Sequence, residues 1–224
     1  MQAKKILVTG IGGNVGQGIL RNLRNTEYIL QVIGTDVSAL SAGNYLCDKI
    51  YTLPFAYASN YIQEMIRLCE DEQVDLIIPS TDYETYYLSK HRKDLPLLAC
   101  LPFETCEVFV DKYKTYIAFN KTGIPFAHAL LPSDYNNEFD NYILKPREGR
   151  GSRGLHFNPI DVHSFSDEDY MVQEVHVGKE LTTAFYVDRN GELLSQITLE
   201  RELQNGTTIF CSVVKNYDEK IEDI

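Results

Sequence analysis

The residues with the clearest chemical potential are a lysine and the basic, glycine-rich segment that follows it. The sequence KPREGRGSRG runs from Lys145 to Gly154, with four positive charges and one negative charge. Loop N–H groups, a hydroxyl and cations together suit a polyphosphate. The segment is not a Walker A loop, because its lysine precedes the loop. Arg147, Arg150 and Arg153 would repel one another without an anion, so we expect the loop to order on binding. A solvated, basic hairpin tip is the alternative interpretation.

A second glycine-rich turn, TGIGGNVG, extends from Thr9 to Gly16. It matches the TGxxGxxG pattern of extended short-chain dehydrogenases, and Asp36 lies where an acid would bind a ribose. Two interpretations stay open, a dinucleotide site or glycines that merely allow a helix to pack closely on a strand. The YxxxK pair that dehydrogenase chemistry needs, Tyr86 and Lys90, is expected about once by chance. We therefore expect Tyr86 to pack and Lys90 to be solvated.

Two carboxylates follow the basic loop along the chain. Gln173 and Glu174 end a predicted strand, and Glu180 follows in a Gly-Lys-Glu sequence. Carboxylates beside a crossing between two layers could contact a ligand, whereas edge-strand charges are the alternative. No Ser-His-Asp or Cys-His set is apparent, and the five histidines share no metal-ligand spacing.

The elements that must position the first turn alternate in the N-terminal half. Short apolar strands are predicted at 5–9, 30–35, 49–53, 75–79 and 97–101. Helical spacing is predicted from Val15, over 62–69 with Ser59 or Asn60 as the cap, and after Asp82. This alternation predicts a parallel sheet that is covered on both faces, which is a Rossmann-like α/β unit.

The pattern changes from about Pro102. Asp111 can cap a helix over 112–121 that stops at Gly123, and a strand is expected over 126–130. Further strands deliver Lys145 and end at Glu174. Two more, at 182–187 and 193–199, are joined by a turn that contains Asn-Gly, a strong hairpin signal.

The composition excludes several classes of protein. The chain has 224 residues, 44% of them hydrophobic, and a net charge of −11. This charge disfavours nucleic acid and anionic membranes as partners. The longest uncharged stretch, 50–63, is too short and too polar for a membrane span. Five scattered cysteines without CxxC spacing argue against a disulfide framework or a zinc site, so we expect a cytoplasmic protein.

Together these segments resemble the ATP-grasp superfamily, and most closely its branch related to the carbamoyl-phosphate synthase large subunit and to carboxylate-amine ligases. The motifs that carry the resemblance are Asp-Lys at 111–112, Lys-Pro with the glycine loop at 145–154, Gln-Glu-Val at 173–175 and Gly-Lys-Glu at 178–180. The resemblance implies a Rossmann-like pre-ATP-grasp domain over 1–107. It also implies an ATP-grasp α+β lid subdomain over 108–175 and an incomplete antiparallel core subdomain over 176–224.

The resemblance also implies roles for single residues. Lys112 and Lys145 would hold the ATP phosphates, and the loop would close over them with Gly149, Gly151, Ser152, Arg153 and Gly154. Gln173 would belong to the adenine hinge, at which Glu174 and the Val175 backbone would read adenine. Glu180 would take the ribose hydroxyls. Arg201 is the one catalytic candidate, near the phosphates. A substrate region would contain Gly12, Gly13, Asn14, Asp82 and Glu84.

The implied activity is that of an ATP-dependent ligase. ATP would phosphorylate a carboxylate or bicarbonate, and an amine would attack the acyl phosphate, so the implied partners are small molecules; a homodimer is compatible with this. The family's Mg²⁺ ligands would lie beyond residue 224, so we expect none in this chain, which by itself would be inactive. Asp218, Glu219, Glu222 and Asp223 suggest a solvated tail. The alternatives are an NAD(P)-dependent oxidoreductase of the extended short-chain type and a non-catalytic ATP-binding module.

Overall fold

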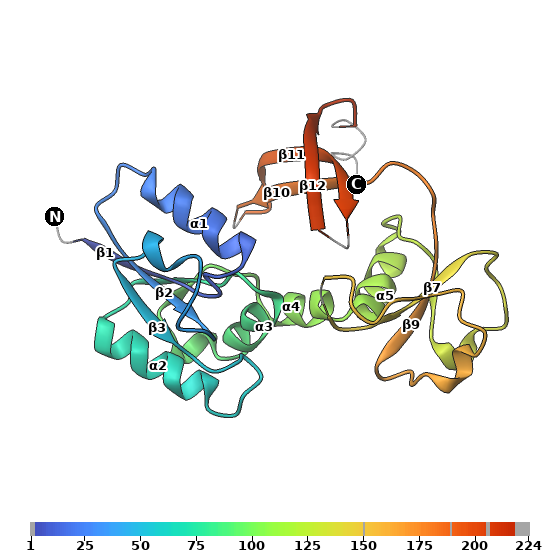
Figure 1. Ribbon diagram of the computed structural model, residues 1–224, viewed down its shortest axis with the longest axis horizontal. Coiled ribbons are helices and arrows are strands. Elements are labelled where there is room, and N and C mark those ends of the chain that lie inside the picture. Colours follow the sequence, from blue (N-terminus) through green and yellow to red (C-terminus); the bar gives the residue numbers. More distant parts are fainter. Residues whose placement is uncertain (1–2, 150, 189, 205–206, 218–224) are drawn as a thin grey trace. The chain divides into compact units, whose positions relative to one another are not determined.

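The computed structural model describes residues 3–149, 151–188, 190–204 and 207–217 (Figure 1). Arg150 and the acidic tail from Asp218 lie outside these residues. The chain divides into two compact units, 1–110 and 111–224. The predicted division into three parts, at 107 and 175, stays a prediction. No helix within the described ranges is both long and apolar enough to cross a membrane.

The first unit is built on a five-stranded parallel sheet in the order β3-β2-β1-β4-β5. Its strands are β1 (Lys4–Val8), β2 (Leu30–Asp36), β3 (Lys49–Thr52), β4 (Leu76–Ile78) and β5 (Leu97–Leu98). Its helices are α1 (Asn14–Arg24), α2 (Tyr61–Glu72), α3 (Asp82–Lys90) and α4 (Phe103–Val110), with short 3-10 turns η1 (Asn44–Leu46) and η2 (Arg92–Asp94). The predicted Rossmann-like alternation is confirmed.

Helices cover both faces of this sheet, and strand alternation sets which residues they meet. On one face, Leu20 of α1 packs in a buried cluster with Ile6 and Val8 of β1. On the other face, Met65 of α2 packs with Leu7, the residue between them. Figure 1 shows α1 and α2 on opposite sides of the sheet. The carboxyl end of β1 therefore opens into the glycine turn directly before α1.

The end of the sheet differs from the prediction. The fifth strand stops at Leu98 instead of continuing to 101, because the guanidinium of Arg92 donates to the carbonyls of Leu98, Cys100 and Leu101. Helix α4 follows where no helix was predicted, and its Phe103 ring lies 5.5 Å from that of Tyr86 on α3.

The helix caps follow the prediction only in part. Asn60 stands at the N-cap of α2, but its side chain makes no capping bond. Thr81 caps α3 by accepting from the N–H of Glu84. Asp111 caps α5 as predicted, since it accepts from the N–H groups of Tyr113 and Lys114 at 2.9 and 3.2 Å.

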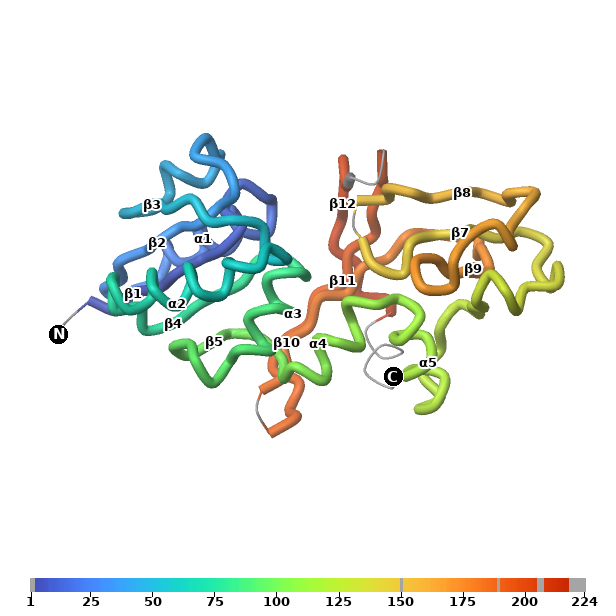
Figure 2. The backbone as a smooth tube through the Cα atoms, turned by 90° about the horizontal axis from the view of Figure 1, so that it is seen from below, coloured from blue at the N-terminus to red at the C-terminus, as the bar shows by residue number. Residues whose placement is uncertain are grey.

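The second unit contains helix α5 and two antiparallel sheets, ordered β6-β9-β7-β8 and β10-β11-β12. Figure 2 shows β7 beside both β8 and β9. Helix α5 is Lys112–Thr122, and the strands are β6 (Ala129–Leu130), β7 (Tyr142–Pro146), β8 (His156–Phe157), β9 (Tyr170–Glu174), β10 (Leu181–Val187), β11 (Leu193–Gln204) and β12 (Thr207–Val214). Two 3-10 turns, η3 (Pro132–Asp134) and η4 (Val162–Ser164), connect them.

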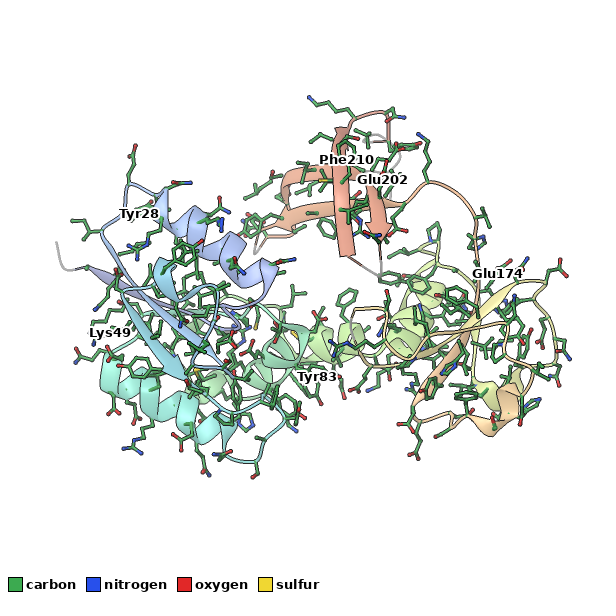
Figure 3. All side chains as sticks on the ribbon, in the orientation of Figure 1. Tyr28, Lys49, Tyr83, Glu174, Glu202 and Phe210 are labelled. Atoms are coloured by element: carbon green, nitrogen blue, oxygen red, sulfur yellow. The ribbon has the colours of Figure 1, made fainter. Side chains whose placement is uncertain are left out.

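Strand lengths in this unit were predicted less well. The strand expected over 126–130 keeps only the two residues of β6, while β11 continues past 199 to Gln204. Strands β8 and β12 were not predicted. Along β10 to β12 several apolar side chains are exposed, among them Phe185 and Phe210, and Figure 3 marks Phe210 on β12.

Candidate functional site

A cavity of about 330 Å³ lies in the second unit, at the segment that the sequence marks as a phosphate loop. Ligand pockets typically have about 300–1,000 Å³. The cavity brings together six of the predicted nucleotide-binding residues, which are Lys112, Lys145, Gly149, Gly151, Ser152 and Arg153. Its apolar lining comes from Ile143, Pro146 and Leu155, none of which was among the predicted binding residues.

Local structure places these side chains. Because residues alternate along β7, Ile143 and Lys145 share one face, while Leu144 is buried on the other face with Val172. Asp111 begins α5 at its cap, which puts Lys112 at the first helical position, where its N–H donates to the Arg147 carbonyl at 2.9 Å. The two lysines therefore come from different elements and meet at one cavity.

The path of the loop requires glycine. Gly149, Gly151 and Gly154 have φ angles of +135°, +66° and +68°, which side chains of L-residues rarely allow. At Gly154 an added Cβ would also lie only 2.9 Å from the ring of Pro146. The three glycines thus stand where the backbone favours glycine, while Ser152 adopts a φ of +54° without being one.

The surroundings of the Lys145 side chain disfavour its charged ammonium form. Burial, together with the positive charge of Lys112, lowers the pKa of Lys145 to about 8. Its Nζ donates to the side-chain oxygen of Gln173 at 2.5 Å, and the Gln173 amide in turn donates to the Ala127 carbonyl at 3.2 Å. An anion in the cavity would stabilise this ammonium far better than an amide oxygen does. The site is therefore prepared for negative charge.

Lys112 also closes the loop in the free chain. Its Nζ donates to the carbonyls of Arg147 and Gly149 at 3.2 and 3.0 Å. Both bonds are to neutral carbonyls, so the ammonium can exchange them for charge-assisted bonds to phosphate.

Arg147 does not behave as the sequence suggested. Its guanidinium is paired with Asp111, and the two side chains are only 19% and 7% exposed. The expected repulsion among the loop arginines is therefore wrong for Arg147, because a carboxylate neutralises it. This pairing could not be predicted from local sequence, since Asp111 lies 36 residues away.

The predicted adenine-binding residues lie at the end of β9, beside the cavity strand β7. Gln173 is opposite Ile143 in the ladder, on the face that carries Lys145, whereas alternation assigns Glu174 to the other face. Figure 3 labels Glu174, whose carboxylate lies 3.6 Å from the His176 ring nitrogen. Strand β9 has neighbours on both sides, so Glu174 is not an edge-strand charge. The N–H of Val175 donates to the Asn141 carbonyl at 3.0 Å.

Glu180 and Arg201 meet each other in the three-stranded sheet. The guanidinium of Arg201 donates to the Glu180 carboxylate at 2.6 Å, and the Arg201 N–H donates to the Glu180 carbonyl at 2.9 Å. The Nε atom of Arg201 is buried and has no hydrogen-bond partner within the described residues. Their predicted contacts with ribose and phosphate stay predictions.

The glycine turn of the first unit is packed tightly. An added Cβ at Gly16 would lie 2.5 Å from the Gly10 carbonyl oxygen, and Asp36 accepts from the N–H of Gly12 at 2.7 Å. The cavity next to Asp36 has only about 70 Å³, well below the usual range for ligands. These observations favour the packing interpretation over a dinucleotide site. Lys90 is exposed, as expected, and Tyr86 packs on α4.

The Glu84 side chain is hydrogen-bonded to Thr9, the first residue of this turn. Its carboxylate accepts from the hydroxyls of Thr9, Thr81 and Tyr61 at 2.8, 2.7 and 3.5 Å. Burial raises the pKa of Glu84 despite these bonds. The other residues of the predicted substrate region, Gly12, Gly13, Asn14 and Asp82, are exposed at the same turn and at the start of α3. Their contact with a substrate stays a prediction.

A group of acids or of histidine and cysteine ligands for a metal is not found within the described residues. The cavity lining likewise contains lysine, arginine and serine but no carboxylate in that part of the chain. The cavity is therefore suited to an anion and not to a bare cation.

Comparisons with known proteins agree with this architecture. Residues 6–99 match the model of the PylC-like N-terminal domain family. No curated protein matches the chain. Among solved structures, N5-carboxyaminoimidazole synthetase from Staphylococcus aureus, complexed with ADP, superposes with a TM-score of 0.77 at 12% identity, over 100% of this chain and 62% of that one. The chain has the ATP-grasp fold. At the level of the fold, the resemblance inferred from the sequence is thereby confirmed.

Two further structures show how widely this fold is shared. The biotin carboxylase domain of the Hydrogenobacter thermophilus 2-oxoglutarate carboxylase, in complex with MgADP, ADP and bicarbonate, has a TM-score of 0.67 at 13% identity, over 93% of this chain and 52% of that one. An L-amino acid ligase from Bacillus licheniformis has a TM-score of 0.67 at 12% identity, over 99% and 57%. The chain thus spans about half to three fifths of the length of these structures.

Proposed function

We propose that the chain carries the nucleotide-binding part of an ATP-dependent ligase, which activates a carboxylate or bicarbonate as an acyl phosphate for attack by an amine. The observation that carries the proposal is the cavity at which Lys112 and the depressed-pKa Lys145 meet the glycine loop. Transfer of a phosphoryl group depends mainly on positioning and on neutralising charge, which cations and backbone N–H groups supply.

In this proposal each cavity residue has a defined task. Lys145 would exchange the Gln173 oxygen for a phosphate oxygen, and Lys112 would exchange its loop carbonyls in the same way. The Ser152 hydroxyl and the loop N–H groups would close over the phosphates, and Ile143 with Leu155 would exclude water. The described cavity residues include no carboxylate and do not fit Mg²⁺.

The solved structures support this choice of chemistry through their own ligands and names. One contains ADP, one contains ADP with bicarbonate, and one is an amino acid ligase. Reading of adenine by Glu174 and Val175, a ribose contact by Glu180 and a closer relation to carbamoyl-phosphate synthase belong to the same proposal. A location in the cytoplasm and a homodimer are expectations that accompany it.

Thermal-shift titration tests which cofactor binds. We expect ATP and ADP to raise the melting temperature of the wild-type protein, and at the same ligand concentration to raise that of Lys145→Ala by less, because stabilisation grows with the logarithm of ligand over Kd. Lys90→Ala, an exposed lysine on α3, is the matched control and should respond like the wild type. A shift of several degrees with NAD or NADP and none with ATP would contradict the proposal and favour an oxidoreductase.

Product analysis separates a ligase from a non-catalytic binding module. When assayed in a protein that also includes the Mg²⁺ ligands expected beyond residue 224, a ligase should release ADP and phosphate from ATP only when a carboxylate or bicarbonate is present. An added amine should then yield an amide or carbamate. If the protein binds ATP but no carboxylate, bicarbonate or amine in a panel triggers the release of ADP and phosphate, the ligase is refuted and a binding module remains.

A further inference from the structure

All three nitrogens of the Arg147 guanidinium donate hydrogen bonds within the described residues. Its Nε donates to both Asp111 oxygens at 3.2 and 3.1 Å, and its Nη2 donates to the same carboxylate. Its Nη1 donates to the Asp167 carbonyl at 2.7 Å. The guanidinium carbon lies 5.5 Å from the centre of the Tyr113 ring. The charge of Arg147 is thus directed at the start of α5, and not at the cavity.

The backbone of Arg147 continues this connection. Its N–H donates to the Asp169 carbonyl at 2.8 Å, just before β9. Its carbonyl accepts from both the N–H and the Nζ of Lys112, at 2.9 and 3.2 Å. One residue therefore joins the start of α5, the start of the phosphate loop and the turn before β9. Lys112 directly follows Asp111 in the chain, and Lys145 lies two residues before Arg147.

We propose that Asp111 and Arg147 are a positioning pair, which holds Lys112 and the phosphate loop in register for nucleotide binding without touching the nucleotide. This inference rests on the proposed function, because the cavity it serves is the proposed ATP site. The pair suits the task, since a guanidinium and a carboxylate in two-pronged contact fix orientation as well as distance. A loop rich in glycine needs such an anchor, because its own backbone is permissive.

Three substitutions separate positioning from direct contact. Asp111→Asn keeps a good helix cap while it removes the charge. Arg147→Gln removes the fork, and Arg147→Lys keeps the charge without the fork. We expect each to weaken ATP binding, measured by calorimetry at a temperature where all variants are folded, by about tenfold, the effect of one misplaced charge-assisted contact. The Asp111→Asn/Arg147→Gln double variant should bind no worse than the weaker single variant, because both changes break one unit.

Val162→Ala is the matched control for general loosening. Val162 is 4% exposed and packs with Leu144 and Val172, on the face of the sheet opposite to Lys145. It should melt at a lower temperature and bind ATP like the wild type. Unchanged binding in Asp111→Asn with weakened binding in Arg147→Gln would show that the guanidinium contacts the nucleotide, and would overturn the proposal. Equal weakening in Val162→Ala would overturn it as well.

Hydrogen exchange in the nucleotide-free protein keeps this inference apart from the proposed function. The backbone N–H groups at positions 112 and 147 should exchange faster in Asp111→Asn and Arg147→Gln than in the wild type. In Val162→Ala they should exchange as in the wild type. If the wild-type protein binds no ATP but these amides respond as expected, the proposed function fails and the positioning of the loop stands. If the amides do not respond, the pair does not hold the loop and the inference is wrong.

Discussion

ATP affinity should fall as the pH rises above about 8, because Lys145 then loses its proton and with it the positive charge that attracts the phosphates. Its pKa is about 8 in the free protein, against an ordinary value of 10.5. A bound phosphate favours the charged lysine and moves the pKa back towards its ordinary value. Binding above pH 8 must therefore take up a proton.

The size of the effect follows from these two values. Each pH unit between 8 and 10.5 should weaken binding about tenfold, and below about pH 7 this lysine should add no pH dependence. From pH 7 to pH 9 the net loss is about tenfold, since the lysine is still mostly protonated at pH 7. The free protein should gain stability over the same range, because the fold penalises the charged lysine.

Calorimetric titration of ATP between pH 7 and 9.5 measures this slope. Lys145→Arg is the control, because a guanidinium keeps its charge to about pH 12 or beyond, so its affinity should stay flat. Lys90→Met should keep the wild-type slope, since Lys90 is exposed on α3. A flat wild-type profile, or an equally steep one in Lys145→Arg, would refute the assignment of Lys145 to the phosphates.

Three more predictions concern single residues. Lys145→Ala should lose about 1.5–3 kcal/mol of ATP binding, measured by calorimetry, while Lys90→Ala should lose none; equal losses would place the site elsewhere. Gly154→Ala should lower the melting temperature, because it forces a side chain into a left-handed backbone with no room for Cβ, whereas Gly178→Ala, in open space, should not. Glu84→Gln should become more stable relative to the wild type as the pH rises from below 4.5 through the raised pKa of Glu84, because the buried carboxyl is then charged. Urea unfolding at several pH values checks this, and a pH-independent difference would contradict it.

Local signals predicted much of the fold. Asp111 and Gly123 begin and end α5 as their types require, and the apolar strands of the first unit pair in the expected parallel sheet. The glycine spacing after Lys145 also identified a loop that needs glycine. In each case the physical cause lies within a few residues of the pattern, which makes it visible in the sequence.

Contacts between distant segments could not be predicted in the same way. β5 ends where the Arg92 guanidinium donates hydrogen bonds to three backbone carbonyls. The register of β7 and β9 places Gln173 beside Lys145, and no local pattern indicates this pairing. A count of loop charges could not show that Asp111 neutralises Arg147. Alternation along β7 could have assigned Ile143 to the cavity, because it shares a face with Lys145.

Hydrogen exchange with bound ligand is the measurement that tests the nucleotide site most directly. With Mg-ATP, peptides that cover 112–116 and 145–155 should exchange more slowly than in the free protein, and NAD should leave them unchanged. The cavity residues lie in these two segments, apart from Ile143. If NAD slows amide exchange at 9–16 and 36–44 and ATP does not change exchange at 145–155, the assignment of this cavity to a nucleoside triphosphate is contradicted.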